Sequence, residues 1–296
     1  MTSQLKIVST CKPFVGEDAI RQRNAIRSWV NAAGADNVVL VGDEEGVAET
    51  CTTFGIAHFE SVERLDGRLP SLRGVLECPL LDESATITYV NADIILPTDF
   101  VGEIEAIAKT FTKFMIVGER WSIRLDREIS DLELNNGSLA EFARREGHLP
   151  GPHWIDYFVF PNRLLGDIPP LTVSGYLWDH WLVGRALENG ASVIDATNRI
   201  TAIHQEHRRP DVSTAELRRS KNLMAIPKST RLGTIANSTH VIGVDGRISR
   251  ARSKKYLLGR ALRLLTPFVR ATRPIRVRLG LTLDNLFRIA RRLRRR

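Results

Sequence analysis

The chain has 296 residues, and 43% of them are hydrophobic, which is enough to bury the core of one large or two small domains and excludes disorder throughout. Its 42 Lys and Arg against 34 Asp and Glu give a formal net charge of +8. Residues 247–296 contain 17 basic residues and one acid, Asp284, so residues 1–246 carry a net charge of −8. Charge alone would allow the basic tail to bind nucleic acid, but the tail has little aromatic interleaving and the body is acidic, so a nucleic-acid partner is not expected.

Cysteine use and hydropathy indicate the compartment. Cys11, Cys51 and Cys78 are an odd number without metal-ligand spacing, which favours a reducing environment. No signal-peptide pattern opens the chain, and no stretch approaches the roughly 20 uncharged apolar residues of a membrane span. These features predict a cytoplasmic protein.

The first hundred residues alternate between strand and helix patterns. Apolar and β-branched runs predict strands over residues 4–10, 37–42, 56–62 and 86–95, and helical spacing of apolar residues predicts helices over residues 17–33, 45–54 and 69–81. Such alternation predicts a parallel sheet with helices on both faces and ligands beyond the carboxyl ends of the strands.

The later elements follow with one interruption. We expect a helix over residues 98–111, a strand over 114–118, a polar insertion over 120–153 with a short helix at 138–146, a strand over 154–160, a helix over 176–189, and strands over 192–196 and 200–203. Residues 208–250 are polar and predict an irregular linker. Residues 251–296 predict a basic, amphipathic helical tail, interrupted at Pro267 and Pro274.

The sharpest local feature is Tyr89-Val90-Asn91-Ala92-Asp93, at the end of the strand predicted over residues 86–95. A carboxylate there can hold a divalent cation against a diphosphate, since Mg²⁺ and Mn²⁺ favour hard oxygen ligands. The alternative is that Asp93 caps a turn before the next helix.

Through YVNADIIL, VGERW, IDYFVFP and WDHWL, the chain resembles bacterial nucleotide-sugar glycosyltransferases of the GT-A fold (family 2-like) over roughly residues 4–207. The resemblance implies a Rossmann-like α/β domain over residues 1–207, with a mixed, mainly parallel sheet flanked by helices. It also implies transfer of a sugar from a nucleotide-diphosphate sugar to an acceptor hydroxyl, with inversion as the simpler expectation and Mn²⁺ or Mg²⁺ as cofactor. Asn91 stands where many relatives have the first Asp of a D-x-D motif, so either metal affinity is expected to be reduced or metal dependence is expected to be lost.

The same resemblance implies a donor pocket. Asp43 ends the strand predicted over residues 37–42, where such enzymes place an acid that hydrogen-bonds the nucleoside, and Thr10 and Lys12 would flank that pocket beside Asn91 and Asp93. The alternatives are that Asp43 caps the following helix and that Lys12 is an ordinary surface lysine.

A carboxylate near a helix start is the expected general base. Asp179, in Trp178-Asp179-His180-Trp181, matches the position that inverting relatives use to activate the acceptor hydroxyl. Trp178 and Trp181 could stack on a sugar face, or both could fill the core. The alternative for Asp179 is a charge that stabilises the helix N-terminus.

The motif His204-Gln205-Glu206-His207 follows the last predicted strand of residues 1–207. Relatives often place here a His that completes the metal shell or contacts the diphosphate, and His204 fits best; the alternative is an ordinary exposed histidine pair. The H-x-x-H spacing resembles a zinc pair, but no further Cys or His set lies at a suitable spacing.

Three further residues are candidate substrate contacts. Asp156 interrupts an apolar strand, so it either faces the cleft or is neutralised by a partner such as an Arg. Arg120 and Trp121 follow the strand predicted over residues 114–118 and are placed on the acceptor side.

The tail predicts placement at a membrane, and the alternative is a solvated or partly disordered extension. Leucines alternating with Arg260 and Arg263 can lie in the interface of an anionic membrane, with leucine buried and arginine at the headgroups. A glycan or lipid-linked acceptor, used in cell-surface polysaccharide or glycolipid synthesis on the inner face of the cell membrane, would suit this.

Two functions other than glycosyl transfer stay open. One is a sugar nucleotidyltransferase, although the Gly-rich loop usual in such enzymes is absent from STCKPFVGEDAI. The other is a catalytically inactive membrane- or nucleic-acid-binding scaffold.

Overall fold

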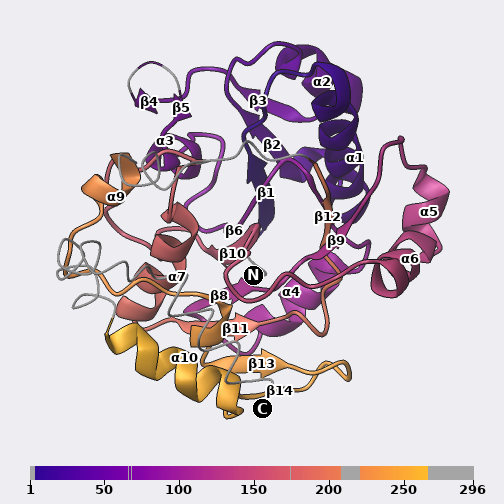
Figure 1. Ribbon diagram of the computed structural model, residues 1–296. Coiled ribbons are helices and arrows are strands. Elements are labelled where there is room, and N and C mark those ends of the chain that lie inside the picture. Colours follow the sequence, from indigo (N-terminus) through magenta and orange to yellow (C-terminus); the bar gives the residue numbers. More distant parts are fainter. Residues whose placement is uncertain (1–3, 66, 68, 174, 208–220, 266–296) are drawn as a thin grey trace, which may run out of the picture.

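The computed structural model describes residues 4–65, 67, 69–173, 175–207 and 221–265 (Figure 1). Within them, nine strands form one sheet in the order β14-β13-β11-β8-β10-β6-β1-β2-β3. The strands are β1 Leu5–Ser9, β2 Val38–Val41, β3 Ala57–Phe59, β6 Thr86–Val90, β8 Phe114–Val117, β10 Tyr157–Pro161, β11 Ser192–Asp195, β13 His240–Ile242 and β14 Ile248–Arg250. Neighbours are parallel except where β10 meets β6 and β8 and where β13 meets β14. The expected mixed, mainly parallel sheet is confirmed.

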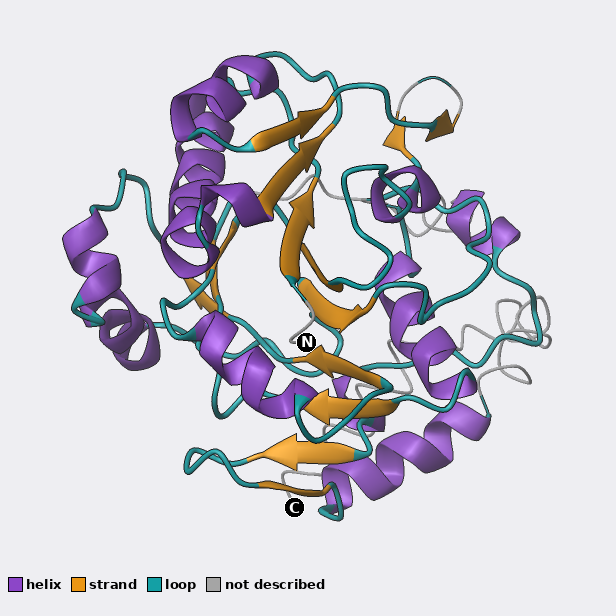
Figure 2. Ribbon diagram, turned by 180° about the vertical axis from the view of Figure 1, so that it is seen from behind, coloured by secondary structure: helices purple, strands orange, loops and turns teal. Residues whose placement is uncertain are grey.

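Helices cover both faces of this sheet (Figure 2). One face carries α1 Gly16–Ala33, α2 Val47–Phe54 and α4 Phe100–Ala108, and the other carries α3 Leu72–Leu76 and α7 Trp178–Glu188. Side chains alternate along each strand, so in β2 Val38 and Leu40 belong to the core beneath α1, whereas Val39 and Val41 belong to the opposite core. This double burial explains why the central strands are continuous apolar runs.

A second sheet has three strands, β7 Ile94–Ile95, β12 Ile203–Gln205 and β9 Trp121–Ile123. The single strand expected over residues 86–95 is therefore wrong. The chain leaves the main sheet after Val90, turns where the Ile94 N–H donates to the Asn91 carbonyl at 3.0 Å, and enters the small sheet as β7. The turn places Asn91 and Asp93 where the two sheets meet.

The insertion expected over residues 120–153 contains β9 and the helices α5 Asp131–Asn135 and α6 Ser138–Glu146, which bury a small core of their own. A two-stranded hairpin, β4 Arg64–Leu65 and β5 Leu69–Pro70, takes part of the helix expected over residues 69–81, of which α3 is the helical remainder.

The irregular linker expected over residues 208–250 differs from the structure in its described part. That part holds α9 Lys221–Ala225, the 3₁₀ turn η2 Ile235–Asn237, and β13 and β14. β13 pairs in parallel with β11, so the main sheet continues beyond residue 207. Strands of three residues are too short to show a period of two in the sequence.

The first part of the tail is helical, as α10 Lys254–Leu264, whereas Pro267 and Pro274 lie outside the described residues. The expected orientation of its arginines is wrong. Arg260 donates to the carbonyls of Ser238 and Ala251, and Arg263 to that of Gly184, so both face the body of the protein.

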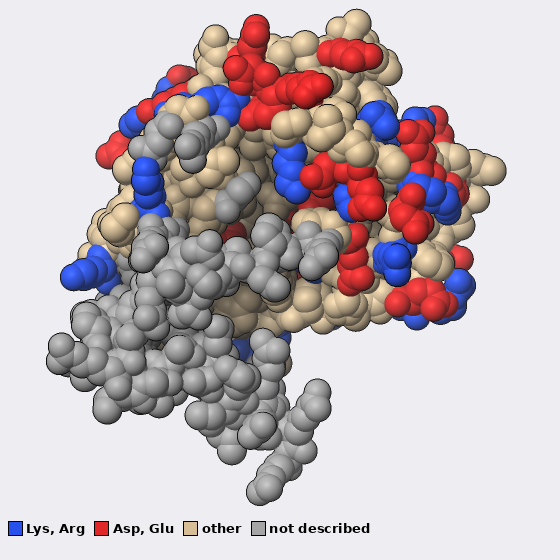
Figure 3. Space-filling view, turned by 45° about the horizontal axis from the view of Figure 1, so that its top comes forward, with Lys and Arg blue, Asp and Glu red and all other residues tan. Residues whose placement is uncertain are grey.

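Acidic side chains form larger continuous patches than basic ones on the face shown in Figure 3, in keeping with the negative charge of residues 1–246. Across the described ranges, each helix is too short or too polar to cross a membrane.

Candidate active site

Several strand ends meet at one edge of the main sheet. β1, β2, β6 and β8 run in the same direction, so the residues after them, including Thr10, Asp43, Asn91 and Arg120, lie along this edge. β10 runs the opposite way, which brings Asp156, just before its first residue, to the same edge. Ligands of open α/β sheets bind at such an edge.

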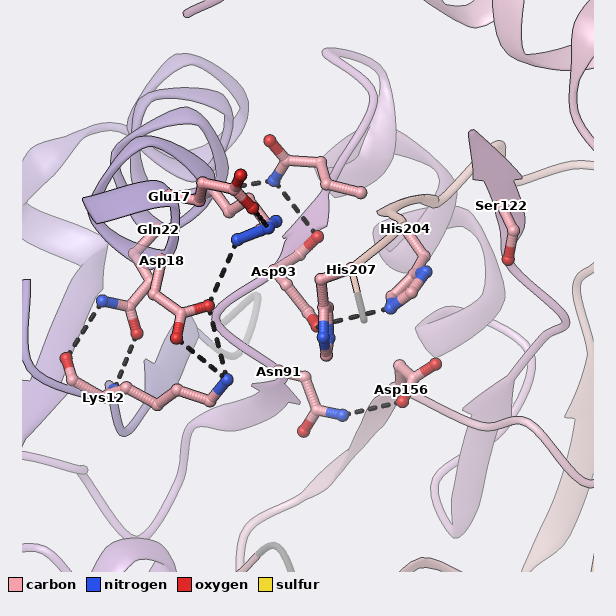
Figure 4. Close-up of polar contacts among 12 residues, drawn as sticks. Lys12, Glu17, Asp18, Gln22, Asn91, Asp93, Ser122, Asp156, His204 and His207 are labelled. Atoms are coloured by element: carbon pink, nitrogen blue, oxygen red, sulfur yellow. Dashed lines mark hydrogen bonds and ion pairs between the residues drawn. The ribbon is translucent and has the colours of Figure 1, made fainter. Parts of the chain in front are cut away.

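Beside this edge, Asp93, His204 and His207 face one another (Figure 4). The Asp93 Oδ2 atom lies 3.4 Å from Nε2 of His204 and 3.2 Å from Nε2 of His207, and the imidazole centroids are 5.5 Å apart. Burial disfavours the charged carboxylate of Asp93, but the contacts with both imidazoles outweigh burial and lower its pKa. Asp93 is therefore held as a carboxylate.

The donor atoms of this cluster fit a divalent cation. One oxygen or nitrogen from each of the three residues lies within 4.8 Å of the others. Asp93 Oδ1 and His204 Nδ1 are buried without a hydrogen-bond partner within the described residues, and His204 Nε2 meets only the Asp93 carboxylate, at 3.4 Å and without hydrogen-bond geometry. Because buried polar atoms without partners are costly, a bound cation would satisfy an unmet requirement of this fold. A carboxylate with two imidazoles suits Mn²⁺ better than Mg²⁺.

The small sheet brings these residues together across a long sequence separation. β12 pairs antiparallel with β7, so that His204 lies opposite Ile94. The buried Gln205 side chain donates to the Asp93 carbonyl at 3.2 Å and to the Arg21 carbonyl at 2.8 Å, which fixes the turn against α1. His207, two residues beyond β12, then reaches the Asp93 carboxylate.

Asn91 turns away from the cluster toward a buried ion pair (Figure 4). Its Nδ2 donates to Asp156 Oδ1 at 2.7 Å, while Arg120 Nε donates to Asp156 Oδ2 at 2.5 Å. Asp156 is thus neutralised by an arginine, one of the two arrangements that its apolar surroundings allow. Because the amide nitrogen donates to Asp156, the amide oxygen is the only side-chain atom of Asn91 that could bind a cation.

A cavity of about 250 Å³ adjoins the His204–His207 pair. Trp154, 39% exposed, lines it and lies over the Arg120 guanidinium, with 5.5 Å from its ring centroid to Cζ. The remaining lining residues are Ser122, His148, Pro150 and Glu206. An aromatic ring beside several polar groups is a composition found in ligand-binding pockets.

The tryptophans expected to contact substrate lie elsewhere. Trp178 is 5% exposed because it packs on Tyr89, edge to face at 5.0 Å, and on Phe158, so stacking on a sugar is wrong for it. Trp181 is equally buried in the same core. Trp121 packs against the small core of the insertion and does not line the cavity.

Asp179 lies in the first turn of α7. Burial raises the pKa of its carboxyl, the nearby His180 ring and backbone N–H oppose the rise, and the Asp156 carboxylate adds to it. The His180 N–H donates to Asp179 Oδ1 at 2.8 Å, which orients the carboxylate.

The three residues predicted for the donor side follow β1 and β2. Thr10 Oγ1 is buried without a hydrogen-bond partner inside the described part of the chain. The Lys12 ammonium lies 3.2 Å from Asp18, and its backbone is held by the Gln22 amide. Asp43 is half exposed and pairs with Arg64.

The side chains of Asp43 and Asp93 do not have the capping roles that were the alternatives to a role in ligand binding. The N-cap of α2 is Gly46, with no side-chain cap from Asp43. Asp93 lies in the turn before β7, but its Oδ2 contacts His204 and His207 and its Oδ1 accepts no hydrogen bond within the described residues, so its side chain does not cap that turn. Asp43 and Asp93 are therefore left for other contacts.

Sequence reasoning missed His207 and Trp154. The H-x-x-H spacing was a signal for His207, although residues three apart do not normally share a direction in an extended chain. For Trp154 no local signal exists, because its role depends on Arg120, 34 positions earlier.

No protein-family model and no curated protein matches this chain. Similar solved structures include glucosyl-3-phosphoglycerate synthase from Mycobacterium tuberculosis with Mn²⁺, UDP and phosphoglyceric acid, at 14% identity and a TM-score of 0.48, over 84% of this chain and 86% of that one. S. aureus TarS with UDP-GlcNAc is similar at 10% identity and a TM-score of 0.46, over 70% of this chain and 60% of that one. Likeness this low transfers no residue role.

Proposed function

We propose that this protein is a glycosyltransferase that moves a sugar from a nucleotide-diphosphate sugar to an acceptor hydroxyl. Asp93, His204 and His207 would hold Mn²⁺ or Mg²⁺, and Thr10, Lys12, Asp43 and Asn91 would line the donor side. The observation that carries the proposal is the partly buried three-residue cluster, with its unsatisfied atoms, at the edge where β1, β2 and β6 end.

The reaction assigns a role to Asp179. Its carboxylate accepts the proton of the acceptor hydroxyl, whose oxygen attacks the anomeric carbon from the side opposite the diphosphate. The bond between that carbon and the diphosphate oxygen breaks, the leaving group takes the electron pair, and the sugar is transferred with inversion. When bound, the cation supplies positive charge to the departing diphosphate. A raised carboxyl pKa makes Asp179 a stronger base.

The cavity beside Trp154 is the proposed acceptor subsite. The indole face would stack on an acceptor sugar, while Arg120, held in place by Asp156, would present a fixed hydrogen-bonding group to the cavity. Such a subsite fits a glycan or a lipid-linked sugar, and hence cell-surface polysaccharide or glycolipid synthesis on the cytoplasmic side of the membrane.

A donor panel tests the proposal. The full chain is incubated with Mn²⁺ and a set of nucleotide sugars that includes UDP-Glc and UDP-GlcNAc, and donor binding and hydrolysis are measured. We expect at least one donor to be bound and hydrolysed. Asp93→Asn should weaken binding at least tenfold, whereas Asp36→Asn, an exposed acid remote from the site, should not change it.

Two outcomes would overturn the proposal. One is that no donor in the panel is either bound or hydrolysed, which would leave an inactive scaffold. The other is release of diphosphate from a nucleoside triphosphate and a sugar phosphate, which would identify a nucleotidyltransferase.

A further inference from the structure

The helix α10 has its polar side turned toward the protein. Lys255 Nζ lies 3.1 Å from Glu119 Oε1 and 3.2 Å from Asp195 Oδ2, and the Tyr256 hydroxyl donates to Asp195 Oδ2 at 2.9 Å. One turn further, Gly259 faces η2 so closely that a Cβ atom there would lie 2.2 Å from the Ala236 carbonyl oxygen. Together with the inward contacts of Arg260 and Arg263, these interactions fix which side of the helix faces out.

The outward side is apolar. Leu257, Leu258, Leu262, Leu264 and Leu265 are 55%, 41%, 40%, 60% and 52% exposed. Residues three, four and seven apart share a helix face, so these leucines and the exposed Ala261 form one stripe. An ordinary surface helix buries its apolar stripe and exposes its polar side. In α10 this arrangement is inverted, which marks an interaction surface.

Charge around this leucine face identifies its partner. Arg247, Arg250, Arg252 and Lys254 are exposed directly before it, at the end of the molecule that α10 shares with β13 and β14 (Figures 1 and 2). From residue 266 to the end, the sequence has ten arginines and one acid. Like charge opposes a second copy of this chain on the face. An apolar stripe flanked by positive charge is complementary to a bilayer of anionic lipid.

We infer that the leucine face of α10 docks the protein onto an anionic membrane surface, with the leucines in the interface and the flanking basic residues at the headgroups. This inference does not depend on the proposed function. It differs from the arrangement expected from sequence, because Arg260 and Arg263 hold the helix to the protein and leave headgroup contacts to Lys254 and the basic residues before it.

Vesicle flotation tests the inference. The full chain is mixed with phosphatidylcholine vesicles, with or without phosphatidylglycerol. We expect it to float only with the anionic vesicles and to be released by high salt, which screens charge. Leu258→Glu/Leu265→Glu should lower the bound fraction at least tenfold. Leu132→Glu, a 70% exposed leucine on α5, should leave binding unchanged. Hydrolysis of donor without vesicles should be equal in all three proteins, so that loss of docking is distinguished from loss of activity.

Three results would overturn the inference: no flotation of the natural chain, flotation of the double variant equal to that of the natural chain, or a dimer in gel filtration that the double variant dissociates. A second measurement avoids any effect of the glutamates on folding. Cys11, Cys51 and Cys78 are buried, so a fluorophore attached to Leu258→Cys reports on α10 alone. Its emission should shift to the blue with anionic vesicles, while a probe on Leu132→Cys should not respond. An unchanged spectrum at both positions would contradict docking.

Discussion

The buried pair of Arg120 and Asp156 allows a quantitative prediction. Their side chains are 3% and 13% exposed, and each is held by other groups, with Asn91 donating to Asp156 and Arg120 donating to Ser122. Arg120→Met removes the only cation within hydrogen-bonding distance of Asp156 in the described structure and leaves a buried carboxylate with one amide donor. Breaking such a pair on one side costs about 3–5 kcal/mol.

Urea unfolding of the natural chain and the variant measures this loss. The slope of the unfolding free energy against urea concentration should be the same for both proteins. The double variant Arg120→Met/Asp156→Asn removes both charges and keeps an oxygen that accepts from Asn91. It should recover most of the lost free energy of unfolding, to within about 1 kcal/mol of the natural chain. A loss below about 1 kcal/mol in Arg120→Met, or a double variant no more stable than the single one, would refute the view that this pair is a coupled unit.

Two further predictions concern α7. The pKa of Asp179 is raised by burial, so the folded state binds its proton more tightly than the unfolded state, and stability falls as pH rises from the ordinary carboxyl pKa of 3.8 through the raised value. Asp179→Asn should therefore abolish transfer, spare donor binding and raise Tm at neutral pH; unchanged turnover would remove Asp179 as the base. Gly184→Ala places a Cβ atom 2.4 Å from the Arg231 carbonyl oxygen and should lower stability by about 1–3 kcal/mol, whereas Gly102→Ala in α4, with nothing within 4 Å, should raise it slightly; equal Tm values would contradict this contact.

The strands of the main sheet were predictable because the sheet is covered on both faces. Continuous apolar runs such as NVVLVG and FMIVG need no partner to be read as buried strands, and they became β2 and β8. Order along the sheet then placed Thr10, Asp43 and Asn91 at one edge, since parallel strands share their carboxyl ends. This much follows from local pattern and general topology.

The composition of the site was less predictable, because it depends on pairings between distant segments. His204 meets Asp93 through a two-residue strand, β7, whose sequence reads as a continuation of β6. Asp156 could have faced a substrate or an arginine, and only the antiparallel direction of β10 brings it to Arg120. Likewise, the sequence of α10 shows an amphipathic helix, but which side faces out depends on Glu119 and Asp195.

The proposed function depends most on the cation site, and Mn²⁺ titration followed by electron paramagnetic resonance tests this site directly. The natural chain should bind Mn²⁺, and added UDP should tighten that binding. His204→Ala should weaken it at least tenfold, whereas His148→Ala, an exposed histidine of the neighbouring cavity that is not part of the cluster, should retain it. Equal Mn²⁺ affinity in the natural chain and in His204→Ala, with no effect of UDP, would contradict the site.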